Sequence, residues 1–283
     1  MPIVVNTNVS SLNAQRQLTT NTMNLGKSLE RLASGFRINK ASDDAAGLQI
    51  SENLRSQIRG SKKALDNVQD GVNVMNIMDG ALSSITNNLQ RMRELTVQAS
   101  SDTNSATQRT AIEGELDELA NEITRLTDAT QFNGVDLFNS SLSGFKIHVG
   151  PNNSSTNDVI DLDTGNVFDD IGAVNLQVDD ANVVVDSNTN ALATLGKIDS
   201  ALNTVNTRRA SLGAITNRLE GTASNLSVSI ENLSASESRI RNVDVASESA
   251  ELVRNQILQQ ASATVLSQAN QGPQLALSLL RGG

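Results

Sequence analysis

Residues that could do acid–base or metal chemistry are few and scattered in this chain. His148 is the only histidine and there is no cysteine, so neither an HExxH zinc site nor a cysteine-ligated metal site can form. The segment 161–165 weakly resembles a calcium loop. An EF-hand loop starting at Asp161 would need glycine at its sixth position and glutamate at its twelfth. Those positions hold Asn166 and Gly172, so we expect no metal ion there.

Paired carboxylates and the common phosphate and nucleophile motifs do not indicate an active site either. Asp43 and Asp44 are adjacent, and adjacent side chains diverge on a helix. The pair is better explained as the first turn of a helix, where the helix dipole favours anions. Walker A, GxGxxG and GxSxG patterns are absent. The sequence therefore predicts no catalytic residue, no cofactor and no enzymatic activity.

Composition favours an elongated helical protein. Only 2% of the 283 residues are aromatic, whereas compact cores draw much of their buried area from aromatic side chains. The net charge of −9 argues against a nucleic-acid partner. No apolar run reaches the roughly 18 residues of a membrane span, and residues 1–17 lack the pattern of a signal peptide. We expect neither nucleic acid nor a membrane as a partner.

Apolar residues at steps of three and four predict long helices that pack along a seam. The first helix is expected to begin with Ser42 as its N-cap and to end at about Ser100. Asp79 is the one polar residue in its apolar seam. A shorter helix is expected at 107–129, and the partner of the first long helix begins near Asn190. A further helix is expected at 250–270, ended by the interruption at 272–273, where a proline removes a helical hydrogen bond.

The middle of the chain has a different pattern. Runs at 145–149, 159–162 and 181–185 are β-prone and are separated by Gly, Asn and Asp, which predicts a small set of hairpins. Asn-Gly at 133–134 predicts a turn before them. Between Lys146 and Lys197 there are eight Asp and no Lys, Arg or Glu, so this surface should be acidic. The predicted fold is mainly α: a long antiparallel coiled-coil rod, a small β-hairpin region in its middle, and paired N- and C-terminal helices.

Each end of the chain carries a narrow apolar stripe that has no partner within its own segment. Such stripes are buried by pairing the two ends and then by packing against copies of the chain. Contacts between two different patches on identical copies propagate into helical filaments unless they close. An ordinary monomeric helical bundle is the alternative. The stripe consists of Leu18, Leu25, Leu29, Leu32, Phe36, Ile257, Leu258, Ala261, Val265, Leu279 and Leu280.

The terminal segments have low apolar content, and isolated helices are only marginally stable in water. We therefore expect residues 5–35 and 250–280 to be disordered in the free monomer and to fold on assembly.

Five collinear motifs resemble those of bacterial flagellin, the subunit of the flagellar filament. They are LERLASGFRINKASDDAAGLQIS at 29–51, LQRMRELTVQ at 89–98, TQFNG at 130–134, SESRIR at 236–241 and LSLLR at 277–281. The resemblance implies a structural subunit that self-assembles through its terminal helices into the helical filament used for motility. It also implies export through the flagellar type III apparatus, so that the chain is secreted and lies in the extracellular filament.

The same resemblance implies three regions. A terminal coiled-coil domain, 1–42 with 243–283, would line the filament core. A helical rod domain, 43–131 with 189–242, would surround it. Residues 132–188 would form a β-hairpin segment of the rod, and the large outer domains of many flagellins would be absent.

Partners are implied by the resemblance as well. Besides the homopolymer, they are the flagellar export chaperone and the hook-associated proteins. A vertebrate Toll-like receptor recognises similar flagellins through the RxRELxVQ helix and the helix after it, and the matching positions are Arg91, Leu95 and Glu115. The alternative is that Leu95 is a core residue and Arg91 an exposed partner of Glu94. The closing LSLLR is linked to the chaperone and to an intracellular innate sensor. Its matching positions are Leu277, Leu279, Leu280 and Arg281, with two further glycines beyond them.

Two other functions stay open on the sequence. A hook–filament junction protein has flagellin-like ends and would cap a filament rather than propagate it. The run LASGFRINKASDDAAG and the closing LSLLR fit filament flagellins better. A secreted helical adhesin or effector would need a binding domain in the middle of the chain, where the stretch between Lys146 and Lys197 leaves little room.

Overall fold

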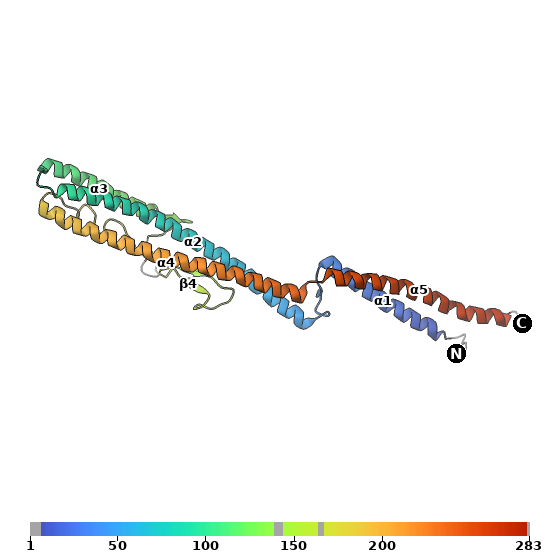
Figure 1. Cartoon of the computed structure of the whole chain (residues 1–283). Helices are drawn as coiled ribbons and strands as arrows, with labels where there is room; N and C mark the ends of the chain where they lie inside the picture. Colours follow the sequence, from blue (N-terminus) through green and yellow to red (C-terminus); the bar gives the residue numbers. More distant parts are fainter. Residues whose placement is uncertain (1–6, 139–143, 164–166, 282–283) are drawn as a thin grey trace. The chain divides into compact units, whose positions relative to one another are not determined.

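The computed structural model describes residues 7–138, 144–163 and 167–281, with side chains described up to residue 271. These ranges contain five helices and four short strands (Figure 1). The mainly α fold predicted from the sequence is confirmed, as is the pairing of the N- and C-terminal helices. In chain order the elements are α1 (Val9–Ser34), α2 (Ala45–Ala99), α3 (Ala106–Ala129), β1 (Gln131–Phe132), β2 (Val135–Asp136), β3 (Lys146–His148), β4 (Val159–Asp161), α4 (Asn188–Arg241) and α5 (Val245–Arg281).

The chain divides into two compact units. Unit 1 comprises residues 1–56 and 232–283, and its described part contains α1 paired with α5. Unit 2 comprises residues 57–231 and contains most of α2 and α4, together with α3 and the strands.

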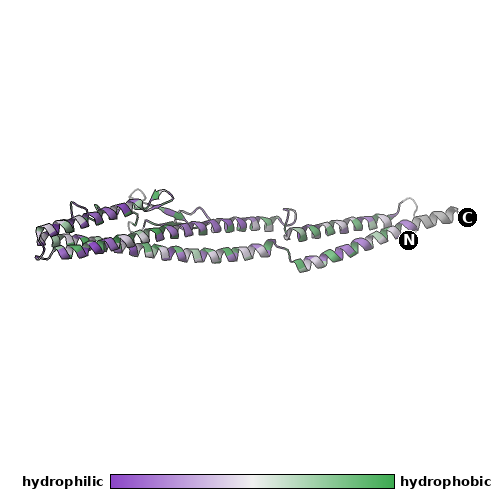
Figure 2. Ribbon diagram, turned by 90° about the horizontal axis from the view of Figure 1, so that it is seen from above, coloured by the Kyte–Doolittle hydropathy of each residue, from purple (hydrophilic) through white to green (hydrophobic). Residues whose placement is uncertain are grey.

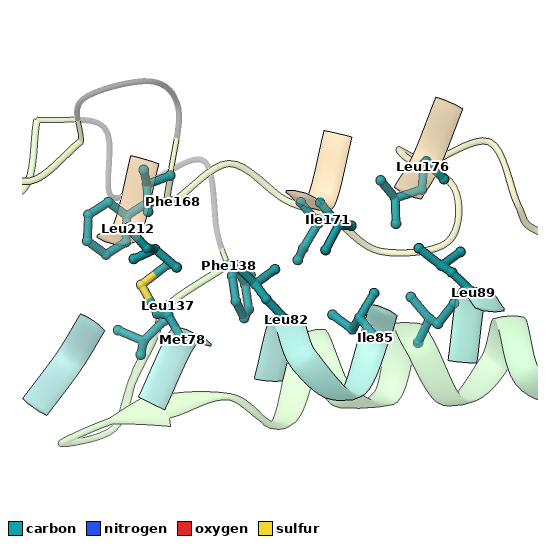
Figure 3. Close-up of a cluster of buried hydrophobic side chains, with 14 of the residues drawn as sticks. Met78, Leu82, Ile85, Leu89, Leu137, Phe138, Phe168, Ile171, Leu176 and Leu212 are labelled. Carbon is teal, nitrogen blue, oxygen red and sulfur yellow. The ribbon is translucent and has the colours of Figure 1, made fainter. Parts of the chain in front are cut away.

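Unit 2 is built around a continuous apolar core. On α2 the fully buried side chains recur at steps of three and four residues, which is the spacing that predicted this helix. Side chains from four parts of the chain meet there. Figure 3 labels Met78, Leu82, Ile85 and Leu89 of α2, Leu137 and Phe138 after β2, Phe168, Ile171 and Leu176 of the segment before α4, and Leu212 of α4.

Asp79, the polar residue in the apolar seam of α2, lies at the edge of this core. Met78 is fully buried, whereas the neighbouring Asp79 accepts a hydrogen bond from Arg209 Nε on α4 at 2.9 Å. Both members of this ion pair keep a substantial exposed fraction. Asp79 therefore links α2 to α4 at the surface while Met78 fills the core.

The strand predicted at 181–185 is wrong, because this stretch runs as irregular chain against the helices. Val183 and Val185 are fully buried, so the apolar pattern there reflects core packing. The backbone of Val184 bonds to a side chain instead of to another strand. Its N–H donates to Thr194 Oγ1 at 3.2 Å, and the Thr194 hydroxyl donates back to its carbonyl at 2.9 Å. These groups are satisfied without a sheet partner.

Two antiparallel hairpins occupy the middle of the chain. In the first, β1 pairs with β2 around Asn133 and Gly134, which have φ of 51° and 76°. Positive φ at both central residues is the geometry of a tight hairpin turn, so the predicted turn is confirmed. In the second, β3 pairs with β4, with Ile147 opposite Ile160. This hairpin lies against α2, where the Asn67 amide donates to the carbonyl of His148 at 3.0 Å.

The predicted start of α2 needs correction. The helix begins at Ala45, and the residue that caps it is Asp44, whose carboxylate accepts the Gly47 N–H at 2.9 Å. Asp43 lies before the helix, where its carboxylate accepts the backbone N–H groups of Asn39 and Lys40. Ser42 is therefore not the N-cap. The sequence contained three adjacent capping residues, and only the loop geometry selects among them.

The interruption predicted at 272–273 is also wrong, because α5 continues from Val245 to Arg281. Proline has no N–H to donate to the carbonyl four residues before it, which here belongs to Ala269. That carbonyl accepts the side-chain amide of Asn8 instead, at 2.7 Å. Within the described ranges no helix is both long enough and apolar enough to cross a membrane.

Candidate assembly surface

Polar contacts recur between helices α1 and α5. Residues early in α1 meet residues late in α5, so the two helices run antiparallel. Direct hydrogen bonds and one ion pair connect α1 with the part of α5 between Glu248 and Asn270. We call these contacts the polar ladder: Asn8–Ala269 at 2.7 Å, Ser11–Asn270 at 2.6 Å, Asn21–Ser262 at 2.8 Å, Thr22–Gln259 at 3.3 Å, Ser28–Asn255 at 3.4 Å and Arg31–Glu248 at 3.4 Å.

The same two helices bury little apolar surface within one chain. On α1 only Ala14 and Ser28 are buried. Several large apolar side chains lie open instead, among them Ile257 with 60% of its surface exposed and Val265 with 56%. Figure 2 shows apolar residues scattered among polar ones along the helices that lead to the two termini. The pairing of α1 and α5 thus leaves apolar surface that one chain does not cover.

The structure divides the stripe that the sequence predicted. Its members fall into three groups, according to the exposure of each side chain. Leu18, Leu25, Leu32 and Phe36 are half-buried, Leu29, Ile257, Leu258, Ala261 and Val265 are exposed, and Leu279 and Leu280 lie outside the described side chains.

Sequence reasoning missed further exposed apolar residues on the same helices. They do not fall on the stripe that pairs α1 with α5, so a search for one narrow stripe passes over them. Marking the apolar residues on the other faces of each helix would have found them. They are Val9, Leu12, Met23, Val245 and Val253.

A groove between α1 and α5 forms part of this surface. It has a volume of about 350 Å³, and its lining includes Ala14, Leu258, Ala261 and Val265. Its exposed walls are mainly apolar.

The loop between α1 and α2 contacts the end of α4 within unit 1. Gly35 adopts φ of 75° and ends α1, and the Arg37 N–H donates to the carbonyl of Arg241 at 2.7 Å. The Arg241 guanidinium lies 4.8 Å from the centre of the Phe36 ring and also pairs with Glu52. Cation–π contact and ion pairing together hold the end of α4 on this loop.

Asp43 is the most strongly perturbed carboxyl group of the loop. Its Oδ1 lies 2.8 Å from Lys27 Nζ on α1. This hydrogen bond from Lys27, with those from the Lys40 and Asn39 backbones, outweighs desolvation and lowers the pKa of Asp43 to about 2. The loop is therefore tied to α1 by a carboxylate that stays ionised at neutral pH.

The three residues matched to receptor recognition lie in different environments of unit 2. Arg91 and Glu115 are exposed and form an ion pair between α2 and α3, with 2.8 Å between Arg91 Nη2 and Glu115 Oε1. Arg91 also contacts Glu94. Leu95 is only 3% exposed and packs in the core. Arg91 and Glu115 are thus available at the surface, and Leu95 supports the helix beneath them.

No group of three or more His, Cys, Asp or Glu side chains among the described residues is arranged to hold a metal ion. His148 is exposed on β3. The calcium-like segment 161–165 is only partly described, because residues 164–166 lie outside the described ranges.

Comparison with known proteins gives the family. The model of the bacterial flagellin N-terminal helical region matches residues 5–143, and that of the C-terminal helical region matches residues 195–280. The chain belongs to the bacterial flagellin family. It is a structural subunit of the flagellar filament, the extracellular part of the flagellum, and assembles as a homopolymer.

Relatives of this flagellin align over nearly the whole chain. The flagellin of Halalkalibacterium halodurans is 43% identical over 279 residues, covering 99% of this chain and all of that protein. The flagellin of Bacillus subtilis is 39% identical over 305 residues, covering 98% of this chain and 99% of that protein. A crystal structure of Bacillus cereus flagellin is 27% identical and aligns with a TM-score of 0.48 over 57% of this chain and 88% of that one.

Proposed function

We propose that this flagellin polymerises by burying the exposed apolar side chains of α1 and α5 between neighbouring copies. The observation that carries the proposal is the amount of apolar surface that the intramolecular pairing leaves open. Burying one Val, Leu or Ile side chain contributes about 1.5–3 kcal/mol. Several such side chains per subunit therefore supply enough free energy to drive association at low protein concentration.

A matched pair of substitutions on α5 tests this proposal. Ile257→Asp places a charge on an exposed apolar position, whereas Gln256→Asp places the same charge on the exposed polar neighbour. Growth from short filament seeds is followed by light scattering and electron microscopy. We expect Ile257→Asp to raise the critical concentration for growth by at least about tenfold, since it replaces burial of an apolar group by burial of a charge. Equal growth of the two variants would refute the proposal.

The proposal assigns a place in the filament to each of three regions of the chain. Residues 1–42 with 243–283 form the terminal coiled coil that lines the filament core. Residues 43–131 with 189–242 form the helical rod around it, and 132–188 form its β-hairpin segment. The pairing of α1 with α5 supports the first assignment. The shared core of α2, α3, α4 and the segments after β2 and before α4 supports treating 132–188 as part of the rod.

Secretion and capping require partners other than the chain itself. We infer that an export chaperone receives the unassembled C-terminal segment, including Leu277, Leu279, Leu280 and Arg281, and that hook-associated proteins meet the filament ends. The exposed apolar residues of α5 support the first inference, because such a surface needs cover before assembly. Chaperone binding to full-length chain but not to chain lacking 250–283 would test it.

Receptor recognition is proposed for the surface pair Arg91 and Glu115, with Leu95 as the buried support of the same helix. The exposure of the pair and its position between α2 and α3 support the proposal. Monomeric Arg91→Asp should lose most Toll-like receptor signalling in reporter cells, and Arg125→Asp, on the same unit, is the control. Unchanged signalling by Arg91→Asp would refute it. The same segment 277–281 is the candidate contact for an intracellular innate sensor.

A capping role at the hook–filament junction is the second candidate, favoured by the flagellin-like ends alone. It predicts chains that bind seed ends and stop growth, which the seeded assay above detects. A secreted adhesin predicts chains that ignore the seeds.

A further inference from the structure

The Asn-Gly turn of the first hairpin places an amide side chain next to an unhindered backbone nitrogen. Asn133 and Gly134 form the only Asn-Gly pair in the sequence. Both residues are exposed, and both adopt positive φ. Glycine has no Cβ to shield its nitrogen, and a Cβ added at Gly134 would meet nothing within 4 Å. The side-chain carbonyl carbon of Asn133 is therefore open to attack by the nitrogen that follows it.

Neither of the two reacting groups is held by a hydrogen bond. Within the described residues the Asn133 side chain forms none, and the Gly134 N–H donates to no acceptor. A bonded N–H would have to give up its acceptor before it could react, and a bonded amide would have to leave its partner. At this turn both groups face solvent without that cost.

Two other loop asparagines followed by a small residue are restrained. After Asn104, the Ser105 N–H donates to a side-chain oxygen three residues further on, at 2.8 Å. After Asn153, the Ser154 N–H donates to Asp158 Oδ2 at 3.2 Å. In both cases the nitrogen that would attack is engaged and belongs to a residue with a Cβ. These two sites serve as internal comparisons for Asn133.

The hairpin around the turn is small enough to open. Ring closure needs the peptide between Asn133 and Gly134 to rotate out of the tight-turn geometry. Strands β1 and β2 have two residues each, and of these four only Phe132 is even half-buried. A two-stranded hairpin of this size is marginal by itself, and segments with few buried contacts open at a small cost in free energy. The turn can therefore reach the reactive geometry without unfolding unit 2.

We propose that Asn133 is a self-modification site, at which the chain converts its own asparagine into isoaspartate. The Gly134 nitrogen loses its proton to solvent base and bonds to Asn133 Cγ. The bond from Cγ to the side-chain nitrogen breaks, and that nitrogen takes a proton from water and leaves as ammonia. A cyclic succinimide remains. Water then opens the ring: attack at the main-chain carbonyl of Asn133 gives isoaspartate, and attack at Cγ gives aspartate. No oxidant or reductant takes part.

Isoaspartate changes the hairpin because it puts one more carbon atom into the backbone. The two-residue turn matches the pairing of Phe132 with Val135, and a longer turn does not. The chain after the turn depends on this geometry. The Leu137 N–H donates to the Thr130 carbonyl at 3.0 Å, and the Leu137 and Phe138 side chains lie in the core (Figure 3). The modification therefore weakens the attachment of this segment to unit 2.

Ageing of the full-length chain in mildly alkaline buffer tests the proposal. Isoaspartate is labelled with an isoaspartyl methyltransferase and located by peptide mass spectrometry. It should form at Asn133 at least about tenfold faster than at Asn104 or Asn153, because only the hairpin turn has to open. Asn133→Gly keeps a turn sequence that favours positive φ at both positions, and it should abolish most of the labelling. Asn153→Gly is the matched control and should leave the labelling unchanged.

The melting temperature gives a second readout. Both products carry one more negative charge than the original chain, so anion exchange separates aged from unaged protein. The isoaspartate form should melt about 2–4 °C lower than unaged chain. Asn133→Asp adds the same charge without lengthening the backbone, and Asp-Gly also supports the turn. This variant should melt close to wild type.

The proposal is overturned if isoaspartate forms at Asn133 no faster than at Asn104 and Asn153, or if Asn133→Gly is labelled as heavily as wild type. It is also overturned if the isoaspartate form melts with the unaged chain. Neither readout involves filament growth, so each result is independent of the assembly surface on α1 and α5.

Discussion

Asn8 donates its side-chain amide to the carbonyl oxygen of Ala269 at 2.7 Å, and this is the carbonyl that Pro273 cannot bond. The same side chain accepts the Ser11 N–H through Oδ1 at 3.1 Å and so caps α1. Asn8 therefore caps α1 and also donates the hydrogen bond that the Ala269 carbonyl of α5 lacks. Because only one alignment of α1 and α5 brings these groups together, the contact fixes the register of the pair at its distal end.

A double-mutant cycle measures this contact in assembled filaments, where both helices are folded. Asn8→Ala should reduce stability by about 1–2 kcal/mol per subunit, through loss of the cap and of the bond to Ala269. In a Pro273→Ala background the Ala269 carbonyl regains a helical donor, so the same substitution should cost only the cap, about 1 kcal/mol. Thermal depolymerisation gives these values. Equal losses in the two backgrounds would show that Asn8 acts only as a cap.

Filament stability should fall at acidic pH through Asp43. The hydrogen bond from Lys27 lowers the pKa of Asp43 to about 2, from an ordinary value of 3.8. A carboxyl group whose pKa is lower in the folded state stabilises that state fully at pH values above its pKa in the unfolded state. This stabilisation is lost as the pH falls through the pKa of the folded state. The loss attributable to this group therefore lies between about pH 4 and pH 2.

Two variants isolate the Asp43 contribution. Asp43→Asn should flatten the pH dependence in that window, and Lys27→Met should move it upward because the largest cause of the shift is gone. Depolymerisation temperature against pH is the measurement. A wild-type curve that superimposes on that of Asp43→Asn would contradict the assignment.

Two glycines of α2 should respond in opposite directions to alanine. A Cβ at Gly71 would lie 2.3 Å from Ile147 Cδ1, whereas a Cβ at Gly80 would meet nothing within 4 Å. Overpacking at the hairpin contact costs about 1–3 kcal/mol, which outweighs the gain in helix propensity of up to about 1 kcal/mol. Gly71→Ala should therefore lower the melting temperature of monomeric unit 2, and Gly80→Ala should raise it. A Gly71→Ala variant that melts at or above wild type would show that Ile147 moves aside freely.

The helices could be predicted from sequence because their apolar spacing coincides with core packing. Met78, Leu82, Ile85 and Leu89 have the same period in the sequence and in the structure. Positions set by a contact with a distant residue could not be predicted. The chain at 181–185 has the composition of a strand, yet the backbone of Val184 bonds to the Thr194 side chain. Proline at 273 predicts a break, yet Asn8, more than 260 residues away in sequence, supplies the missing donor.

The candidate surface shows the same limit. The apolar pattern placed a stripe on both termini. It could not distinguish half-buried Leu25 from exposed Ile257, because each residue fits the apolar face of its own helix. Motif matching likewise selected Leu95 beside Arg91 and left open whether the leucine is a core residue, which its burial in the structure decides. Which side of a helix meets another part of the same chain depends on the register, and here polar contacts set that register.

Cysteine labelling tests most directly whether copies join through the exposed face of α5. The chain has no cysteine, so Ile257→Cys introduces a single thiol at a position that is 60% exposed. Its rate of reaction with a maleimide is compared in monomers, in filaments and in filaments depolymerised by heat. We predict rapid labelling of monomers, labelling at least about tenfold slower in filaments, and full recovery after depolymerisation. Equal rates in monomers and filaments would contradict assembly through this face.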